Sequence, residues 1–180
     1  MATKPRPCSF EGETRVFMAD GSTKRIEDIQ VDDEVLAQDP ETGEKSARRV
    51  THLWVHDDEY VRLEVGDGTV LTTANHPFFD DTDQKWEQVD ELSIGDYLLT
   101  ADGHRVRVGH LRSAAGHGAA YNLTVEGLHT YHVLFGRDAV LVHNQCDEIN
   151  AVGGVGEAPY GPQSLAECSG RMELRSRARR

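Results

Sequence analysis

An internal repeat is the feature that most constrains how this chain can fold. Segment 26–36, with the sequence IEDIQVDDEVL, matches segment 89–99, VDELSIGDYLL, 63 positions later. Each copy has apolar residues three apart, a turn containing aspartate, and then a short apolar strand. Chance similarity between Asp-rich turns is the alternative, but eleven aligned positions with matching apolar spacing disfavour it. We therefore expect two related halves and a pseudo-two-fold fold.

The rest of segment 10–142 consists of short β-prone runs separated by turn signals. Apolar and charged residues alternate in segments 61–65 and 105–108, as they do in half-buried strands. Turn residues such as Gly66-Asp67-Gly68 and Asp102-Gly103 separate these runs. No long amphipathic helix pattern is present. The sequence predicts an all-β fold with short helical turns.

Length and charge limit the class of protein. A chain of 180 residues accommodates one core of ordinary size. Its formal net charge of −12 argues against a nucleic-acid or anionic-membrane partner. The first seven residues lack an apolar signal-peptide region, and no run approaches the roughly 20 apolar residues of a membrane span. We expect a monomer without a membrane segment, either cytoplasmic or part of a larger exported protein.

Composition also predicts the domain boundaries. Residues 1–7 form a short N-terminal flank that ends at Pro7, and residues 8–144 form the folded domain. Beyond residue 144 the chain becomes rich in glycine, proline and, at its end, arginine. Such a composition is typical of a disordered flank, which we expect over residues 145–180.

Reactive residues occupy both ends of the predicted domain. The thiol of Cys8 can attack the carbonyl before it, and the amide of Asn144 can attack its own carbonyl and release the C-terminal flank. The three cysteines, at positions 8, 146 and 168, form no C-x-x-C and do not resemble a disulfide framework. We therefore expect Cys8 to be a reduced, partly exposed nucleophile.

Four motifs in order carry a resemblance to a known family. They are Cys8 followed by Thr14-Arg15-Val16; Thr73-Ala74-Asn75-His76; Tyr121-Asn122-Leu123-Thr124-Val125-Glu126 with His129; and Val142-His143-Asn144. The combination resembles the Hint superfamily, which includes inteins, Hedgehog-type autoprocessing domains and bacterial intein-like or pre-toxin Hint domains. The resemblance implies a horseshoe-like β fold that processes its own chain in cis, without a cofactor.

The resemblance also implies roles for individual side chains. His76 would protonate the amine that leaves when a thioester forms, and Thr73 would hold the oxyanion or orient His76. His143 would protonate the amine released after Asn144, while His129 would polarise the carbonyl or deprotonate the asparagine amide. Asn122 stands where many members have aspartate; it cannot act as a base but can form hydrogen bonds.

Departures from the splicing pattern favour cleavage over ligation. Gln145 follows Asn144 where splicing inteins carry Cys, Ser or Thr, and Cys146 comes one position too late. Pro7 places a constrained ring beside the carbonyl that Cys8 would attack. We therefore expect the domain to act in cis on its own flanking segments, which are its expected partners. We assign no metal ligands, and a Zn²⁺ bound through Cys8 would inhibit rather than assist.

Three alternatives remain open at this point. The first is complete protein splicing. The second is a Cys-His protease that uses Cys8 and His76 on other proteins. The third is a degraded remnant that serves only as a β scaffold between a secretion module and a toxin.

Overall fold

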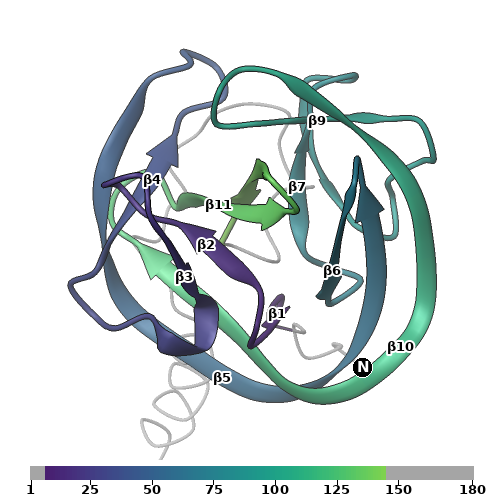
Figure 1. Ribbon diagram of the computed structural model, residues 1–180, viewed down its shortest axis with the longest axis horizontal. Coiled ribbons are helices and arrows are strands. Elements are labelled where there is room, and N and C mark those ends of the chain that lie inside the picture. Colours follow the sequence, from purple (N-terminus) through teal and green to yellow (C-terminus); the bar gives the residue numbers. More distant parts are fainter. Residues whose placement is uncertain (1–6, 145–180) are drawn as a thin grey trace, which may run out of the picture.

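Two strands of 21 residues each, β5 (Lys45–Val65) and β10 (Arg105–Val125), shape the molecule. The structure is a computed structural model that describes residues 7–144. The two long strands pair antiparallel and curve around the outside of the fold (Figure 1). Register shifts interrupt the ladder, one of them between Arg112 and Gly116. Such irregularities let a long strand bend and twist instead of remaining flat.

The other strands are short and fill the space that β5 and β10 enclose. The sheet order is β3-β2-β11-β12-β7-β9-β10-β1-β6-β5-β4, with β8 paired to β7. These strands are β1 (Phe10–Glu11), β2 (Arg15–Phe17), β3 (Thr23–Arg25), β4 (Glu34–Gln38), β6 (Gly68–Thr72), β7 (Pro77–Asp80), β8 (Lys85–Gln88), β9 (Tyr97–Leu99), β11 (Thr130–Phe135) and β12 (Asp138–His143). The 3-10 helix η1 (Ile26–Asp28) is the one helical element among the described residues. The predicted all-β fold with short helical turns is confirmed.

The two copies of the internal repeat form the same pattern of hydrogen bonds. In the first copy, Asp33 Oδ2 accepts the N–H three residues earlier at 2.8 Å, and the Asp33 carbonyl accepts Val50 N–H at 2.8 Å. In the second copy, Asp96 Oδ2 accepts the N–H three residues earlier at 2.7 Å, and the Asp96 carbonyl accepts Val108 N–H at 2.8 Å. Each aspartate thus ties a turn to one of the two long strands. The halves are related in bonding as well as in sequence.

The centre of the fold is occupied by β11 and β12, which pair along their whole length. Their apolar side chains, including Tyr131, Phe135 and Leu141, are fully buried. The hairpin between β5 and β6 packs so closely on the end of β11 that a Cβ at Gly68 would collide with the Phe135 backbone. This tight packing fixes β6, and therefore the segment after it, against the central hairpin.

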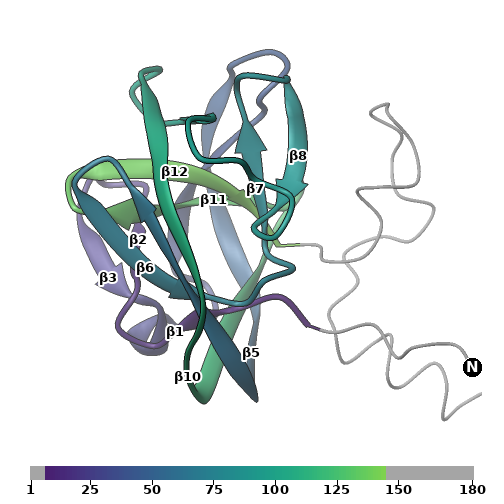
Figure 2. The same ribbon diagram turned by 90° about the vertical axis from the view of Figure 1, so that its right-hand side faces the viewer.

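The two ends of the described chain lie on the same side of the molecule. The chain enters through β1, which pairs with β10 and β6, and leaves after β12 (Figure 2). Residues 1–6 of the predicted N-terminal flank 1–7, and the whole predicted C-terminal flank 145–180, lie outside the described residues. No helix in the described part of the chain is long and apolar enough to span a membrane.

Candidate functional site

The side chain of Asn122 connects the two reactive ends. Its Nδ2 atom lies 3.7 Å from Cys8 Sγ and donates a hydrogen bond of 3.3 Å to the carbonyl oxygen of Asn144. Asn122 lies near the end of β10, directly behind the point where β1 enters. The structure therefore brings the sequence-predicted residues Cys8, Asn122 and Asn144 into one place.

The orientation of this amide is determined by its acceptor atom. Asn122 Oδ1 accepts hydrogen bonds from the Leu123 N–H at 2.8 Å and from the Tyr131 hydroxyl at 3.0 Å. Two donors facing one atom identify it as the oxygen, so the NH₂ group must point toward Cys8 and Asn144. Tyr131 is fully buried, and burial raises the pKa of its hydroxyl. At neutral pH the hydroxyl is therefore protonated and acts as a donor.

Cys8 differs in two respects from what the sequence led us to expect. Its side chain is fully buried instead of partly exposed, and its sulfur is in a disulfide bond. The other two cysteines, Cys146 and Cys168, lie outside the described residues. Only a thiolate can attack a carbonyl, so Cys8 must be reduced before it can act. The expectation of a reduced, partly exposed thiol is corrected accordingly.

The residue after Cys8 is held firmly to the end of β6. Ser9 N–H donates to Thr73 Oγ1 at 3.0 Å, and the Ser9 carbonyl accepts from Thr73 N–H at 2.9 Å and from Thr72 Oγ1 at 3.0 Å. The Ser9 hydroxyl in turn donates to the Cys8 carbonyl at 2.6 Å. Thr73 therefore positions the backbone beside Cys8.

Ser9, His56 and Asp58 do not form a catalytic triad, although their residue types are the right ones. Ser9 Oγ and Asp58 Oδ2 both approach the same nitrogen, His56 Nε2, at 3.5 and 3.4 Å. A triad needs the serine on one ring nitrogen and the carboxylate on the other. The fully buried Ser9 hydroxyl is also already bonded to the Cys8 carbonyl.

His76 is completely buried in the core, where its ring contacts Phe10. It ends a turn in which its own N–H donates to the Thr73 carbonyl at 3.2 Å, so Thr73 orients it through the backbone. Its ring packs on Phe10 with centroids 4.1 Å apart, and neither ring nitrogen has a hydrogen-bond partner among the described residues. Burial, with a smaller contribution from His143, lowers the pKa of His76 to about 3. At neutral pH His76 is therefore an uncharged donor of one N–H.

Asn144 is anchored by the backbone of His129. Asn144 N–H donates to the His129 carbonyl at 2.9 Å, and Asn144 Oδ1 is buried without a hydrogen-bond partner among the described residues. His129 has a φ of +57°, a left-handed conformation that non-glycine residues adopt at a cost of about 1–3 kcal/mol. Burial lowers the pKa of the His129 ring, which favours the neutral form that can accept a proton.

His143 lies between two aromatic rings at the exit of the chain. Its centroid is 5.0 Å from Trp86 on β8 and 6.4 Å from His129. Trp86 in turn packs edge-on against Phe79 at 5.3 Å. The β7–β8 hairpin thus supports the imidazole that the sequence predicts as the donor to the leaving amine.

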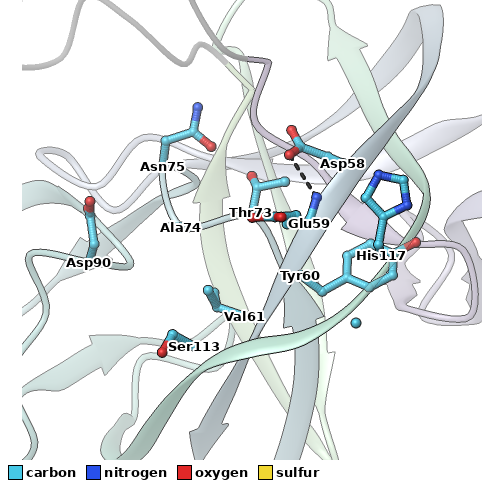
Figure 3. Close-up of a pocket in the computed structure, with 11 residues that line it drawn as sticks. Asp58, Glu59, Tyr60, Val61, Thr73, Ala74, Asn75, Asp90, Ser113 and His117 are labelled. Carbon is cyan, nitrogen blue, oxygen red and sulfur yellow. Dashed lines mark hydrogen bonds between the residues drawn. The ribbon is translucent and has the colours of Figure 1, made fainter.

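A groove lies next to the site formed by Cys8, Asn122 and Asn144, but it does not include the reactive side chains of Cys8 and Asn144. It has a volume of about 650 Å³, and Asn75 and Asp90 face Tyr60 and His117 across it (Figure 3). Thr73 belongs to its lining, whereas Cys8 and Asn144 do not. The two reactive side chains are instead 0% and 8% exposed, which suits a substrate supplied by the chain itself.

Tyr131, Ser9 and Trp86 are neighbours of the reactive residues that the sequence did not reveal. Each has the character of an ordinary strand or turn residue, and only the fold brings it to the site. No sequence signal distinguishes Tyr131, because four consecutive residues of β11, Thr130 to Val133, are buried and burial does not alternate along the strand. The predicted flanking residues Gln145 and Cys146 lie outside the described residues, whereas Pro7 lies at their edge.

Comparisons with known proteins agree with this geometry. A family model described as "Pretoxin HINT domain" matches residues 16–145. The chain is also similar to the solution structure of a bacterial intein-like domain from Clostridium thermocellum, with 34% identity and a TM-score of 0.68. That match covers 77% of this chain and 99% of the other.

More distant structures share the fold alone. A DnaB intein from Synechocystis sp. PCC 6803 is 22% identical, with a TM-score of 0.66, and the match covers 77% of this chain and 99% of that intein. The gp41-1 intein is 19% identical, with a TM-score of 0.63, over 77% of this chain and 100% of that intein. No curated protein sequence matches the chain at a significant level.

We predict that the free energy of unfolding falls when the pH is lowered from 7.5 to 5.5. Burial lowers the pKa of His76 to about 3 and that of His132 to about 4, while both bind protons near pH 6.5 in the unfolded chain. The unfolded state therefore binds more protons in this window, and stability rises with pH. The two groups together account for about 3 kcal/mol.

Chemical denaturation of the reduced protein at several pH values measures this change. His132→Asn should remove about half of the pH dependence. The exposed His117 offers a control, because His117→Gln should leave the dependence intact. A free energy of unfolding that is constant between pH 5.5 and 7.5 would contradict the assignment of neutral buried histidines.

Proposed function

The chain belongs to the pretoxin Hint family of intein-like self-processing domains, and we propose that its main reaction is cyclisation of Asn144 with cleavage before Gln145. The observation that carries this proposal is the hydrogen bond from Asn122 Nδ2 to the Asn144 carbonyl oxygen. That oxygen becomes negative when the carbonyl is attacked. A positioned amide donor stabilises the developing charge, as in an oxyanion hole.

Cyclisation needs two proton transfers beside this donor. Asn144 Nδ2 attacks its own carbonyl carbon and loses a proton, the bond to the Gln145 nitrogen breaks, and that nitrogen gains a proton. Neutral His129 is suited to take the first proton, and the adjacent His143 to supply the second. The products are a C-terminal succinimide and a new amino terminus at Gln145.

A second reaction is proposed at the other end. Once reduced, the Cys8 thiol loses its proton and the sulfur attacks the Pro7 carbonyl carbon. The bond from that carbon to the Cys8 nitrogen then breaks, and the nitrogen gains a proton as it leaves as an amine, so that a thioester remains. Asn122 Nδ2 lies where it can stabilise the thiolate, and the neutral His76 can donate its N–H to the tetrahedral intermediate. Water or an external thiol then removes the N-terminal flank.

Cleavage is favoured over ligation by the residue after Asn144. Gln145 carries neither a hydroxyl nor a thiol, so the N-terminal acyl group has no adjacent acceptor. Burial of Cys8 and His76 likewise disfavours a protease that acts on other proteins. We propose a monomer whose only partners are its own flanking segments.

We predict that the full chain with a reporter fused after residue 180 releases a fragment beginning at Gln145. Asn144→Ala should abolish release, because alanine has no amide to cyclise. Intact mass spectrometry monitors the reaction, and the domain fragment should be one water lighter than hydrolysis would leave it. Asn150→Ala removes another asparagine of the same region and should release at the wild-type rate; release from Asn144→Ala would refute the mechanism.

We predict that loss of the N-terminal flank depends on the redox state of Cys8. A phosphine reductant should permit slow hydrolysis, and dithiothreitol should accelerate it because a thiol attacks the thioester. The measurement uses the Asn144→Ala background, so that only the N-terminal end reacts. Cys8→Ala should respond to neither reagent; the same cleavage rate in the oxidised protein would show that no Cys8 thioester is involved.

We predict that Tyr131→Phe slows C-terminal release by about tenfold, the effect of one hydrogen bond worth roughly 1.4 kcal/mol. Without the tyrosine hydroxyl, Asn122 is free to rotate away from the Asn144 carbonyl. Tyr60→Phe is the matched control, because the Tyr60 hydroxyl donates to the Ala119 carbonyl at 2.6 Å, away from Asn122. Equal release rates for the two variants would exclude a positioning role for Tyr131.

A further inference from the structure

Three carboxylates converge at the base of the β7–β8 hairpin, outside the cleavage site. Asp80 ends β7, Glu87 lies on β8, and Asp96 lies in the turn before β9. One oxygen from each lies within 4.8 Å of the other two. The three residues are brought together because β7 pairs with both β8 and β9.

Asp80 is the unusual member of this group. It is 0% exposed, and its Oδ2 atom is buried without a hydrogen-bond partner among the described residues, while Oδ1 accepts the Thr82 N–H at 2.7 Å. An unpaired buried carboxylate oxygen costs several kcal/mol and is rarely tolerated without a ligand. In this structure the oxygen belongs to a side chain that faces two further carboxylates.

The charges around the group do not balance. Lys85 Nζ pairs with Glu87 Oε1 at 2.7 Å, and Asp96 Oδ2 accepts a hydrogen bond from the uncharged Ser93 N–H at 2.7 Å. Arg105 is nearby, but its guanidinium pairs with Asp81 at 2.7 Å. Among the described residues, Lys85 is the one cation in a salt bridge with any of these three carboxylates, and it also lies 3.5 Å from Asp83.

We propose that Asp80, Glu87 and Asp96 bind a hard divalent cation, with Ca²⁺ as the preferred ion. Carboxylate oxygens are the ligands that Ca²⁺ and Mg²⁺ select. The three oxygens lie within 4.8 Å of one another, so one ion can contact all of them, and the flexible coordination shell of Ca²⁺ accommodates such a set at Ca–O distances of about 2.4 Å. Mg²⁺ at about 2.1 Å requires a tighter octahedron. Water molecules complete the coordination on the half-buried side of Glu87 and Asp96.

The position of the group gives the ion a structural effect. Glu87 is adjacent in sequence to Trp86, whose ring contacts His143 at 5.0 Å. A cation that joins β7, β8 and the turn before β9 holds this hairpin in place. A role of the ion in cleavage, through support of His143, rests on the proposed function. Binding of the cation to the three carboxylates does not.

The test uses Tb³⁺ as a luminescent probe and Ca²⁺ as its competitor. The full chain carrying Asn144→Ala is dialysed against a chelator, so that binding is measured whether or not the wild type cleaves itself. Trp86, next to Glu87, should sensitise Tb³⁺ emission, and Ca²⁺ should displace the probe at lower concentration than Mg²⁺. Ca²⁺ should also raise the melting temperature, because it binds the folded state alone.

Matched variants decide the outcome. Glu87→Gln and Asp80→Asn should each weaken Ca²⁺ binding by at least about tenfold, since affinity depends on the number of charged ligands. Glu41→Gln removes an exposed carboxylate elsewhere and should bind as the parent does. If Asp80→Asn fails to fold, Glu87→Gln with the thermal shift still tests the site. Absence of sensitised emission, or equal Ca²⁺ binding by Glu87→Gln and the parent, would overturn the proposed site.

Discussion

The carboxamide of Asn122 is the contact on which the proposed chemistry depends. One NH₂ group faces both the sulfur of Cys8 and the carbonyl oxygen of Asn144, residues 136 positions apart in the chain. This arrangement exists only because β1 enters beside β10 while β12 ends nearby. The long paired strands, the central hairpin and the close approach at Gly68 all serve to hold these three segments together.

The fold could be predicted from the sequence more completely than the site. The repeat and the alternation of apolar residues are local signals, and both correspond to observed strands and turns. The curvature of β5 and β10 could not be inferred, because irregular pairing such as that between Arg112 and Gly116 depends on two strands at once. Strand lengths were underestimated for the same reason: segments 61–65 and 105–108 are parts of 21-residue strands.

Within the site, residue types were predictable but their environments were not. The motifs identify Cys8, His76 and Asn144, yet nothing in them reveals that the ring of His76 is completely buried against Phe10. That burial changes the chemistry, because an imidazole with a pKa of about 3 cannot carry the charge that its ordinary pKa implies. The hydrogen bond from the Tyr131 hydroxyl to Asn122 Oδ1 was equally hidden, because only the fold brings the two side chains together.

The amide of Asn122 can donate hydrogen bonds to both reactive groups, which a carboxylate at position 122 could not do. A carboxylate could exchange a proton with Cys8, but it would repel the oxyanion that forms at Asn144. The Asn122 amide cannot accept the thiol proton, and it donates to both groups whatever the pH. Its NH₂ group carries two hydrogens and can serve both acceptors at once, and a sulfur held in a disulfide is a weaker acceptor than a thiolate. The proposed N-terminal reaction needs a thiolate and the proposed C-terminal reaction does not, so reduction of Cys8 should separate the two.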